Sequence, residues 1–333
     1  MPLTLYPSIV KKRNQNGTYS DLTPGVITEV DDELSTISTS PVQNGVITRR
    51  LGTDTLLTTA QTLAGAINEH EADIGAIREM VGNYNTAGFH NSIFRGKNLG
   101  SAITAEQWAA INAGTFEDLF IGDYWTINSI NWRIAAFDYW LRCGDTECTT
   151  HHAVIVPDSN LKDANGSTTH FMNTDNITTG AYVGSGFYSG KNADDSDNTA
   201  KAECITMAEN AFGAAHILSH REYFANATTN GYQSAGAWYD STVDMMNEQM
   251  VYGCRVYSNV MNGTNVPNAY TIDKGQLPLF ALAPQYICNR AYWWLRDVVS
   301  AAAFAGVARH GSATYYDASD SGVGVRPAFG IKA

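Results

Sequence analysis

Two histidines in the middle of the chain have a spacing that could bind a metal. His216 and His220 lie four residues apart in the segment HILSH, which would place both imidazoles on one face of a helix, as in zinc-protease helices. In that motif a glutamate follows the first histidine and acts as general base, whereas this chain has Ile217. We interpret the pair as partly buried helix histidines, with metal binding as the alternative.

A second group of possible zinc ligands precedes this pair. Cys143, Cys148, His151 and His152 have suitable side chains, but their spacing matches no structural zinc pattern. Cys143 and Cys148 could also pair across a short loop or remain buried free thiols. The chain has five cysteines, and this odd number argues against a disulfide framework. The other three are Cys204, Cys254 and Cys288.

Other patterns for ligand binding or catalysis are incomplete. Asp194, Asp195 and Asp197 could bind calcium, but the residue order and the glycine of an EF-hand are missing. The segment GSGFYSG at 184–190 misses the dinucleotide-binding pattern by one residue. Neither a nucleophile elbow nor a phosphate-binding loop is present. We therefore predict no catalytic residues, no metal and no cofactor, and we do not expect an enzyme.

The composition favours a loop-rich β protein. Only 16% of the 333 residues are charged, and such a balance is typical of extracellular or virion proteins. The net charge of −12 disfavours binding to nucleic acid, because phosphate backbones are repelled. Apolar runs are too short for membrane insertion. The first 17 residues lack the apolar core of a signal peptide. We therefore expect a protein that is made in the cytoplasm and, if it acts outside a cell, leaves by another route such as lysis.

The N-terminal part divides into two predicted segments. Residues 1–50 alternate short apolar runs with turn signals, which predicts a small β or extended docking segment. Residues 51–85 contain a heptad pattern, and isoleucine at both core positions favours trimers. His70 at one core position would cost stability and fix the register. The alternative is a helix packed on its own domain, which the linker-like residues 82–85 disfavour. The heptad residues are Leu56, Ala60, Leu63, Ile67, His70, Ile74, Ile77 and Val81.

Residues 89–333 read as one α+β domain. A capping box at Thr104 and Gln107 predicts a short helix that ends at Gly114. Runs at 118–127 and 130–141, separated by Asn128 and Ser129, predict a hairpin. Further predicted elements are a strand at 151–157, a loop at 158–198, a helix at 199–225 with a break at Gly213, a helix at 241–253 capped by Ser241 or Thr242, and strands near the C-terminus.

The C-terminal region, residues 292–331, uses few residue types between two definite borders. From Asp297 to Ile331 there is no Lys, Glu, Gln, Met or Trp. Tyr, Ser, Gly and Asp also dominate antibody binding loops, so the region predicts a binding surface held by a rigid frame. A flexible surface loop is the alternative, and the adjacent Tyr315 and Tyr316 argue against it. Pro327 cannot donate a strand hydrogen bond, which predicts a sheet edge or a bulge.

This region resembles the variable region of proteins diversified by retroelements. The resemblance lies in the YWWLRD start, the middle of small and aromatic residues and the GVRPAFGI end. The segments LAGAINEHEADIGAI and FRGKNLGSAITAEQWAAINAGTF are also similar to those of gut-phage tail proteins. The resemblance to these proteins implies a C-type lectin-like fold for residues 89–333. It also explains why Lys, Glu, Gln, Met and Trp are missing, since diversification at adenines of Asn-type codons cannot produce these residues.

The resemblance implies two sets of residues. The varied ligand-contact positions would include Tyr292, Ala303, Gly306, Ala308, His310, Ser312, Tyr315, Tyr316, Asp317 and Ser319. The structural frame would be Trp293, Trp294, Leu295, Arg296, Arg326 and Pro327. Calcium-bound sugar is not implied, because the EPN, QPD and WND triplets of sugar-binding lectins are absent.

The function that the resemblance implies is host recognition. We expect a phage tail receptor-binding protein, located in the virion at the tail tip or fibre. It would form a homotrimer, attach to phage tail proteins through its N-terminus, and bind a protein or glycan receptor on the host cell. One alternative is an oxidase of the formylglycine-generating type, for which Cys254 and Cys288 are the candidate cysteines. The other is a surface adhesin encoded by a prophage or bacterium.

Overall fold

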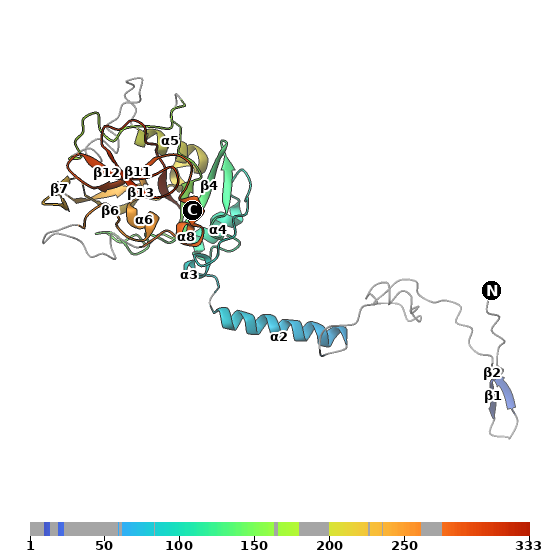
Figure 1. Ribbon diagram of the computed structural model, residues 1–333. Helices are drawn as coiled ribbons and strands as arrows, with labels where there is room; N and C mark the ends of the chain where they lie inside the picture. Colours follow the sequence, from blue (N-terminus) through green and yellow to red (C-terminus); the bar gives the residue numbers. More distant parts are fainter. Residues whose placement is uncertain are drawn as a thin grey trace. The chain divides into compact units, whose positions relative to one another are not determined.

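The chain forms two compact units, Met1–Met80 and Val81–Ala333 (Figure 1). The computed structural model describes residues 10–13, 19–22, 59, 62–82, 84–162, 166–179, 200–225, 227–234, 236–260 and 275–333. Helices and several antiparallel sheets are mixed, which confirms the predicted α+β class. Among the described residues, no helix combines the length and apolar character needed to cross a bilayer.

The first unit contains a small β-ribbon and a long helix. Strand β1 (Val10–Arg13) pairs antiparallel with β2 (Tyr19–Leu22). Helix α2 (Leu63–Val81) follows Thr62, whose hydroxyl accepts the backbone N–H of Gly65 at 3.1 Å. The rest of the predicted docking segment lies outside the described residues, so its prediction stays open.

Helix α2 presents an apolar stripe to solvent. The side chains of Ile67, Ile74 and Ile77 are 52%, 42% and 56% exposed. A helix is therefore present where the heptads predict one, but no coiled coil is visible in the described part of this single copy. Leu56 and Ala60 lie outside the described residues.

The second unit is built around a five-stranded sheet with the order β10-β14-β5-β4-β3. Strands β3 (Tyr124–Ile127) and β4 (Ile130–Phe137) form the predicted hairpin. Its turn residues Asn128 and Ser129 have φ of 51° and 63°, as a two-residue hairpin turn with two left-handed positions requires. The first strand begins at Tyr124, later than predicted, because residues 118–123 form turns and an isolated bridge.

The C-terminal strand β14 (Pro327–Ile331) lies inside this sheet, between β10 (Val243–Met245) and β5 (Ala153–Pro157). The prediction that Pro327 marks an edge or bulge is therefore wrong. Pro327 is the first residue of the strand. Proline is tolerated at this position as well, because its missing backbone N–H removes no hydrogen bond from the interior of the strand.

The short helix α4 (Ala105–Ala113) confirms the predicted capping box. The Thr104 hydroxyl accepts the Gln107 N–H, and the Gln107 side chain accepts the Thr104 N–H. Gly114 ends the helix with a φ of 67°, a left-handed conformation that favours glycine. Helix α3 (Ala87–His90) precedes it.

The predicted helix at 199–225 is wrong in its second half. Helix α5 (Ala200–Phe212) ends before Gly213, and a single 3-10 turn, η1 (Ala214–His216), follows. Residues His220–Phe224 form strand β6, in which every second residue is buried. This alternation of burial is typical of a strand with one face towards the core.

The predicted helix at 241–253 is also mostly wrong. Only Glu248–Tyr252 forms helix α6, because β10 occupies the first part of the segment. Asn247 caps α6 by accepting the Met250 N–H, so the cap is neither Ser241 nor Thr242. Gly253 ends the helix as predicted.

The core lies where α5 covers the five-stranded sheet. The Phe212 ring packs edge-on against Trp132 at 5.8 Å and Phe329 at 5.7 Å, measured between ring centroids. Such aromatic contacts add about 0.5–1.5 kcal/mol each beyond the burial of area. The remaining elements are β7 (Ala227–Thr229), β8 (Tyr232–Ser234), β9 (Ala237–Ser241), α8 (Pro278–Leu282), η2 (Pro284–Tyr286), β11 (Trp293–Val298), β12 (Ala303–Val307) and β13 (Ala313–Asp317).

Candidate functional site

The C-terminal region forms a three-stranded antiparallel sheet, with β12 between β11 and β13 (Figure 1). Every residue of β11 and β12 is buried. Strand β13 lies at the edge, and its residues are exposed or half-buried. The sheet thus has two buried strands that support one accessible strand.

The start and end of region 292–331 are joined through Gly324. The Gly324 N–H donates to the Tyr292 carbonyl, and the Trp294 N–H donates to the Gly324 carbonyl, both at 2.9 Å. A Cβ atom on Gly324 would lie 1.9 Å from Nδ2 of Asn160, so a side chain cannot fit there. Asn160 in turn donates to the Tyr292 carbonyl at 2.9 Å.

The tryptophans of the border are core residues. Trp293, Trp294 and Leu295 have no exposed surface. The Trp294 indole N–H donates to the His170 carbonyl at 2.7 Å, which satisfies its one polar group. The border is therefore fixed by packing and by a hydrogen bond to a segment outside the region.

Arg326 is fully buried and binds carbonyl groups of two other segments. Its Nε donates to Pro157 at 2.8 Å and its Nη1 to Tyr286 at 2.7 Å. The guanidinium also lies 5.2 Å from the ring centroid of Trp293. Burial lowers the pKa of Arg326 to about 10, so the group stays charged at neutral pH. It links the end of β5, η2 and the C-terminal border.

Arg296 forms a buried ion pair with Glu222 on β6 and donates to the Met245 carbonyl at 3.0 Å. Burial alone would raise the pKa of Glu222, but Arg296 and His220 outweigh that effect and lower it to about 2. The pair connects the border strand β11 to β6 and β10. Removing one partner of such a pair leaves a buried charge without compensation.

We expect the ion pair between Arg296 and Glu222 to make the free energy of unfolding depend on pH, and Glu222→Gln should remove this dependence. A carboxyl with a depressed pKa stabilises the fold above its unfolded value of 4.5, and this contribution is lost as the pH falls towards 2. The difference in unfolding free energy between wild type and Glu222→Gln should therefore shrink by about 3 kcal/mol between pH 6 and pH 2. Urea denaturation measures it. The exposed Glu209→Gln serves as control, and a pH-independent difference for Glu222→Gln would contradict the assignment.

The predicted contact positions divide into accessible and buried ones. Three of them lie inside the fold, because Ala303 and Gly306 belong to the middle strand β12 and Ala308 directly follows it. These three offer no side-chain surface to a ligand in this structure. Tyr316 is half-buried. The exposed positions are Tyr292, His310, Ser312, Tyr315, Asp317 and Ser319.

Gly306 and Tyr316 are sterically coupled. The Tyr316 ring packs edge-on against Trp294, with ring centroids 5.7 Å apart. A Cβ atom on Gly306 would approach Cε2 of Tyr316 to 2.7 Å and the Trp293 carbonyl oxygen to 3.1 Å. A larger residue at 306 therefore requires the ring at 316 to move or to be smaller.

We expect Gly306→Ala to lower the free energy of unfolding by about 1–3 kcal/mol, because overpacking forces neighbours out of place. Adding Tyr316→Ser should cost less than the sum of the two single changes, by about 0.5 kcal/mol or more. Urea denaturation of the two single variants and the double variant measures this coupling. Gly88→Ala is the control, because only Thr86 approaches its added Cβ, at 3.9 Å. Strict additivity would contradict the coupling.

The histidine and cysteine candidates do not form a metal site. His216 lies in η1 and stacks on Trp108, whereas His220 lies on β6 and stacks on Trp140, so they do not share a helix face. The described part of the chain contains no group of three or more potential ligands. None of the five cysteines forms a disulfide, so Cys143 and Cys148 do not pair with each other. The aspartates at 194–197 and the glycines at 184–190 lie outside the described residues.

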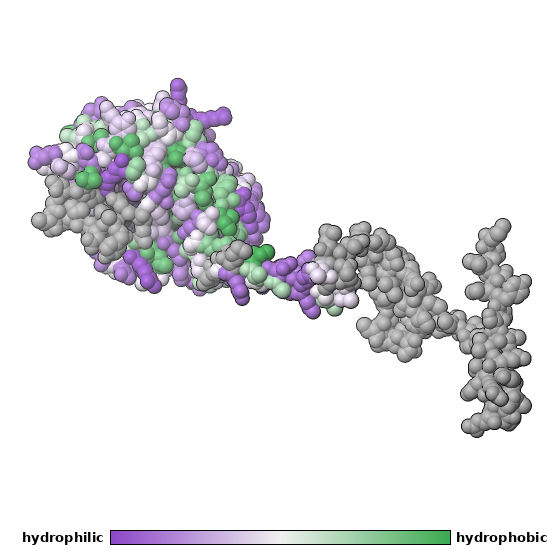
Figure 2. Space-filling model, turned by 60° about the horizontal axis from the view of Figure 1, so that its bottom comes forward, coloured by the Kyte–Doolittle hydropathy of each residue, from purple (hydrophilic) through white to green (hydrophobic). Residues whose placement is uncertain are grey.

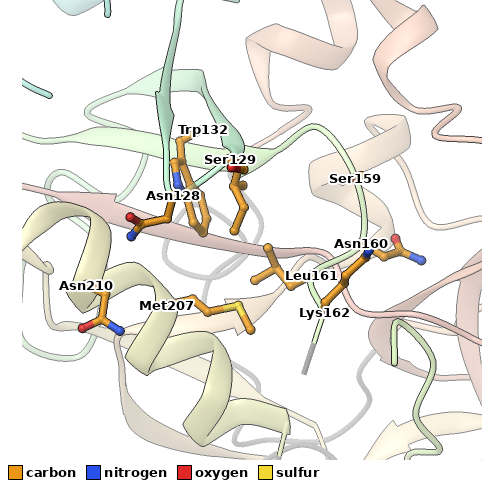
Figure 3. A pocket seen from close by; sticks show the side chains of 10 residues that line it. Asn128, Ser129, Trp132, Ser159, Asn160, Leu161, Lys162, Met207 and Asn210 are labelled. Carbon is orange, nitrogen blue, oxygen red and sulfur yellow. The ribbon is translucent and has the colours of Figure 1, made fainter. Parts of the chain in front are cut away.

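A cavity of about 450 Å³ lies between the hairpin turn, residues 159–162 and helix α5 (Figure 3). Its described lining contains amides, hydroxyls, Met207 and Lys162 but no carboxylate. The Asn160 amide points away from the other lining side chains, consistent with its hydrogen bonds to Tyr292 and Asn289. None of the predicted contact residues lines this cavity.

Two buried carboxylates, one on β11 and one at the start of α6, were not predicted from the sequence. Asp297 on β11 accepts the Glu248 N–H at 2.5 Å and the Gln233 side-chain amide at 3.3 Å. Burial raises the pKa of Asp297. Glu248 has no exposed surface. Only the position of Glu248 directly after Asn247, at the start of a helix, could have indicated a structural role.

No family model, curated protein or solved structure matches this chain.

Proposed function

We propose that this chain is a phage tail receptor-binding protein that displays a diversified surface for host recognition. The observation that carries the proposal is the contrast within one small sheet. Tyr315 is 52% exposed on the edge strand β13, while the two strands behind it are completely buried. Side chains at the exposed positions can therefore change with little effect on the core.

The proposal includes a C-type lectin-like fold for residues 89–333. Support comes from the mixed sheets and from a C-terminal strand that returns into the main sheet. The binding surface needs no calcium, because the sugar-binding triplets are absent. The ligand is a receptor on the host cell surface.

The proposal also includes a homotrimer formed through α2, with residues 1–50 attached to phage tail proteins in the virion. The exposed isoleucine stripe supports the trimer, because three such stripes can bury one another. Three copies allow weak single sites to act together, which suits a surface that varies without optimisation.

We expect His70→Ile to stabilise the trimer, because a polar residue at a core position costs stability. The thermal unfolding of α2, followed by circular dichroism at fixed protein concentration, should shift to higher temperature. Ala72→Ile, outside the heptad core, is the matched control. An unchanged or lower midpoint for His70→Ile alone would contradict the assigned core position.

Binding of labelled full-length chain to intact cells of candidate host strains tests the function. We expect Tyr315→Ser and Asp317→Ser to reduce cell-bound protein, while Tyr84→Ser on the segment before α3 leaves it unchanged. A neighbouring reverse transcriptase gene and a near-identical repeat of the coding segment for 292–331 would support diversification. Cell binding that is insensitive to every exposed position of the region would contradict the proposal.

A further inference from the structure

An exposed apolar loop outside region 292–331 lies against its most accessible tyrosine. Val256, Tyr257 and Val260 are 50%, 42% and 58% exposed. The Tyr257 ring centroid lies 5.2 Å from that of Tyr315, with an angle of 61° between the ring planes. Val256, Tyr257 and Tyr315, named here the Tyr257 patch, thus join a loop to the edge strand β13.

This loop is held by a buried carboxylate. Glu248 accepts the backbone N–H groups of Val256, Tyr257 and Ser258 at 3.0, 2.9 and 2.9 Å. It also accepts the Ser258 hydroxyl at 2.6 Å. A buried charge is costly unless it is fully hydrogen-bonded, and these donors meet that need. The loop conformation is therefore fixed from inside while Val256 and Tyr257 face solvent.

The same support reaches the border of region 292–331. The Glu248 N–H donates to Asp297 on β11, and Asp297 also accepts from Gln233. Arg255 at the start of the loop donates to Gln233 at 3.0 Å and to the Asn259 carbonyl at 3.2 Å. The loop and the frame of β11 are thus braced by one set of buried polar groups.

We propose that residues 255–260 form a constant part of the receptor interface beside Tyr315, and that the occupant is a protein segment presenting an aliphatic or aromatic side chain next to Lys or Arg. This inference rests on the proposed function. Apolar side chains that are about half exposed contribute little to the stability of the chain, whereas tyrosine-rich, preorganised patches are favourable anchors for a partner. The constant loop would supply affinity, and the varied positions of β13 would supply specificity.

Two features favour a protein over a glycan as the occupant. The rings of Tyr257 and Tyr315 meet edge to face, so they form no flat platform for a sugar ring, and Val256 offers no hydrogen-bonding group. Asp317 is exposed on the same face of β13 as Tyr315, since the two residues are two apart on a strand. Together with the net charge of −12, it favours a basic residue beside the apolar anchor.

Selection of bead-displayed random peptides on the full-length chain tests the inference, with a glycan array as a second arm. We expect the selected peptides to contain an aliphatic or aromatic residue next to Lys or Arg. Their affinity should fall about tenfold or more with Tyr257→Ser and with Tyr315→Ser. Tyr84→Ser, a tyrosine of similar exposure, should leave it unchanged. Denaturation midpoints of all variants verify that they are folded.

Each of the other outcomes contradicts one part of the proposed interface. Peptides that depend on Tyr315 but not on Tyr257 would exclude the loop and leave the receptor-binding function standing. Peptides that depend on neither residue would refute the Tyr257 patch as the docking site, whereas the receptor-binding function is tested separately by cell binding of the variants at the exposed positions. Capture of glycans alone would refute the protein occupant, and recovery of no binder at all would refute the patch as a docking site.

A loop variant tests the role of the buried carboxylate. Glu248→Gln keeps the side-chain shape but removes the charge that accepts the loop N–H groups. We expect faster hydrogen exchange at the amides of Val256–Ser258 and weaker binding of the selected peptides, although Tyr257 is intact. Faster exchange with unchanged peptide affinity would show that the loop need not be fixed in order to bind, and would overturn the preorganised interface.

Discussion

Replacing Trp294 with alanine is expected to lower the free energy of unfolding of the second unit by about 3–5 kcal/mol. The indole is fully buried, supports the Tyr316 ring and donates to the His170 carbonyl, so its loss leaves both a cavity and an unpaired acceptor. Replacing Tyr315 with alanine should cost less than about 1 kcal/mol, because half of its side chain is already in solvent.

Urea denaturation of the two single variants measures this contrast. The comparison is well matched, because both are aromatic-to-alanine changes in one three-stranded sheet, on the two strands that flank β12. Similar losses for both variants would show that Tyr315 belongs to the fold and not to an exchangeable surface.

Replacing Ile74 and Ile77 with lysine is expected to convert a trimer into a monomer. Both side chains are exposed on the single chain, so the change costs the monomer little, while six buried lysines in a trimer core would repel one another. Sedimentation of the wild type should give a mass of about 109 kDa, three times 36.2 kDa, and the double variant 36.2 kDa.

Ala72→Lys is the matched control, since residue 72 lies on the same helix but outside the heptad core. This control should remain trimeric. A monomeric wild type would contradict assembly through α2, and a trimeric double variant would place the assembly contacts elsewhere in the chain.

Local signals in the sequence were sufficient for elements that depend on neighbouring residues. The capping box at Thr104 and the turn at Asn128 and Ser129 were predicted correctly, because their hydrogen bonds and dihedral angles are local. The strand at His220–Phe224 was missed because its partner β9 (Ala237–Ser241) lies farther along the chain. His220–Phe224 form a strand because they pair with β9, whereas the preceding residues had indicated that the helix continues.

The candidate site shows the same limit. A restricted alphabet marks region 292–331 but does not separate its surface from its interior, because alanine and glycine fit both. Ala303 and Gly306 are buried only because β12 became the middle strand. The support by Glu248 could not be predicted, since its partners are backbone N–H groups of a loop eight to ten residues away.

Hydrogen exchange in a chain whose exposed positions are changed together tests most directly whether the buried borders keep their structure when the surface varies. The combined variant changes five of the six exposed positions: Tyr292→Ser, His310→Ser, Tyr315→Ser, Asp317→Ser and Ser319→Thr. If buried tryptophan and arginine borders hold an exchangeable surface, the amides of Trp294 and Arg296 keep wild-type protection, because their acceptors are backbone carbonyls of Gly324 and Met246. Loss of that protection in the folded variant would contradict the account.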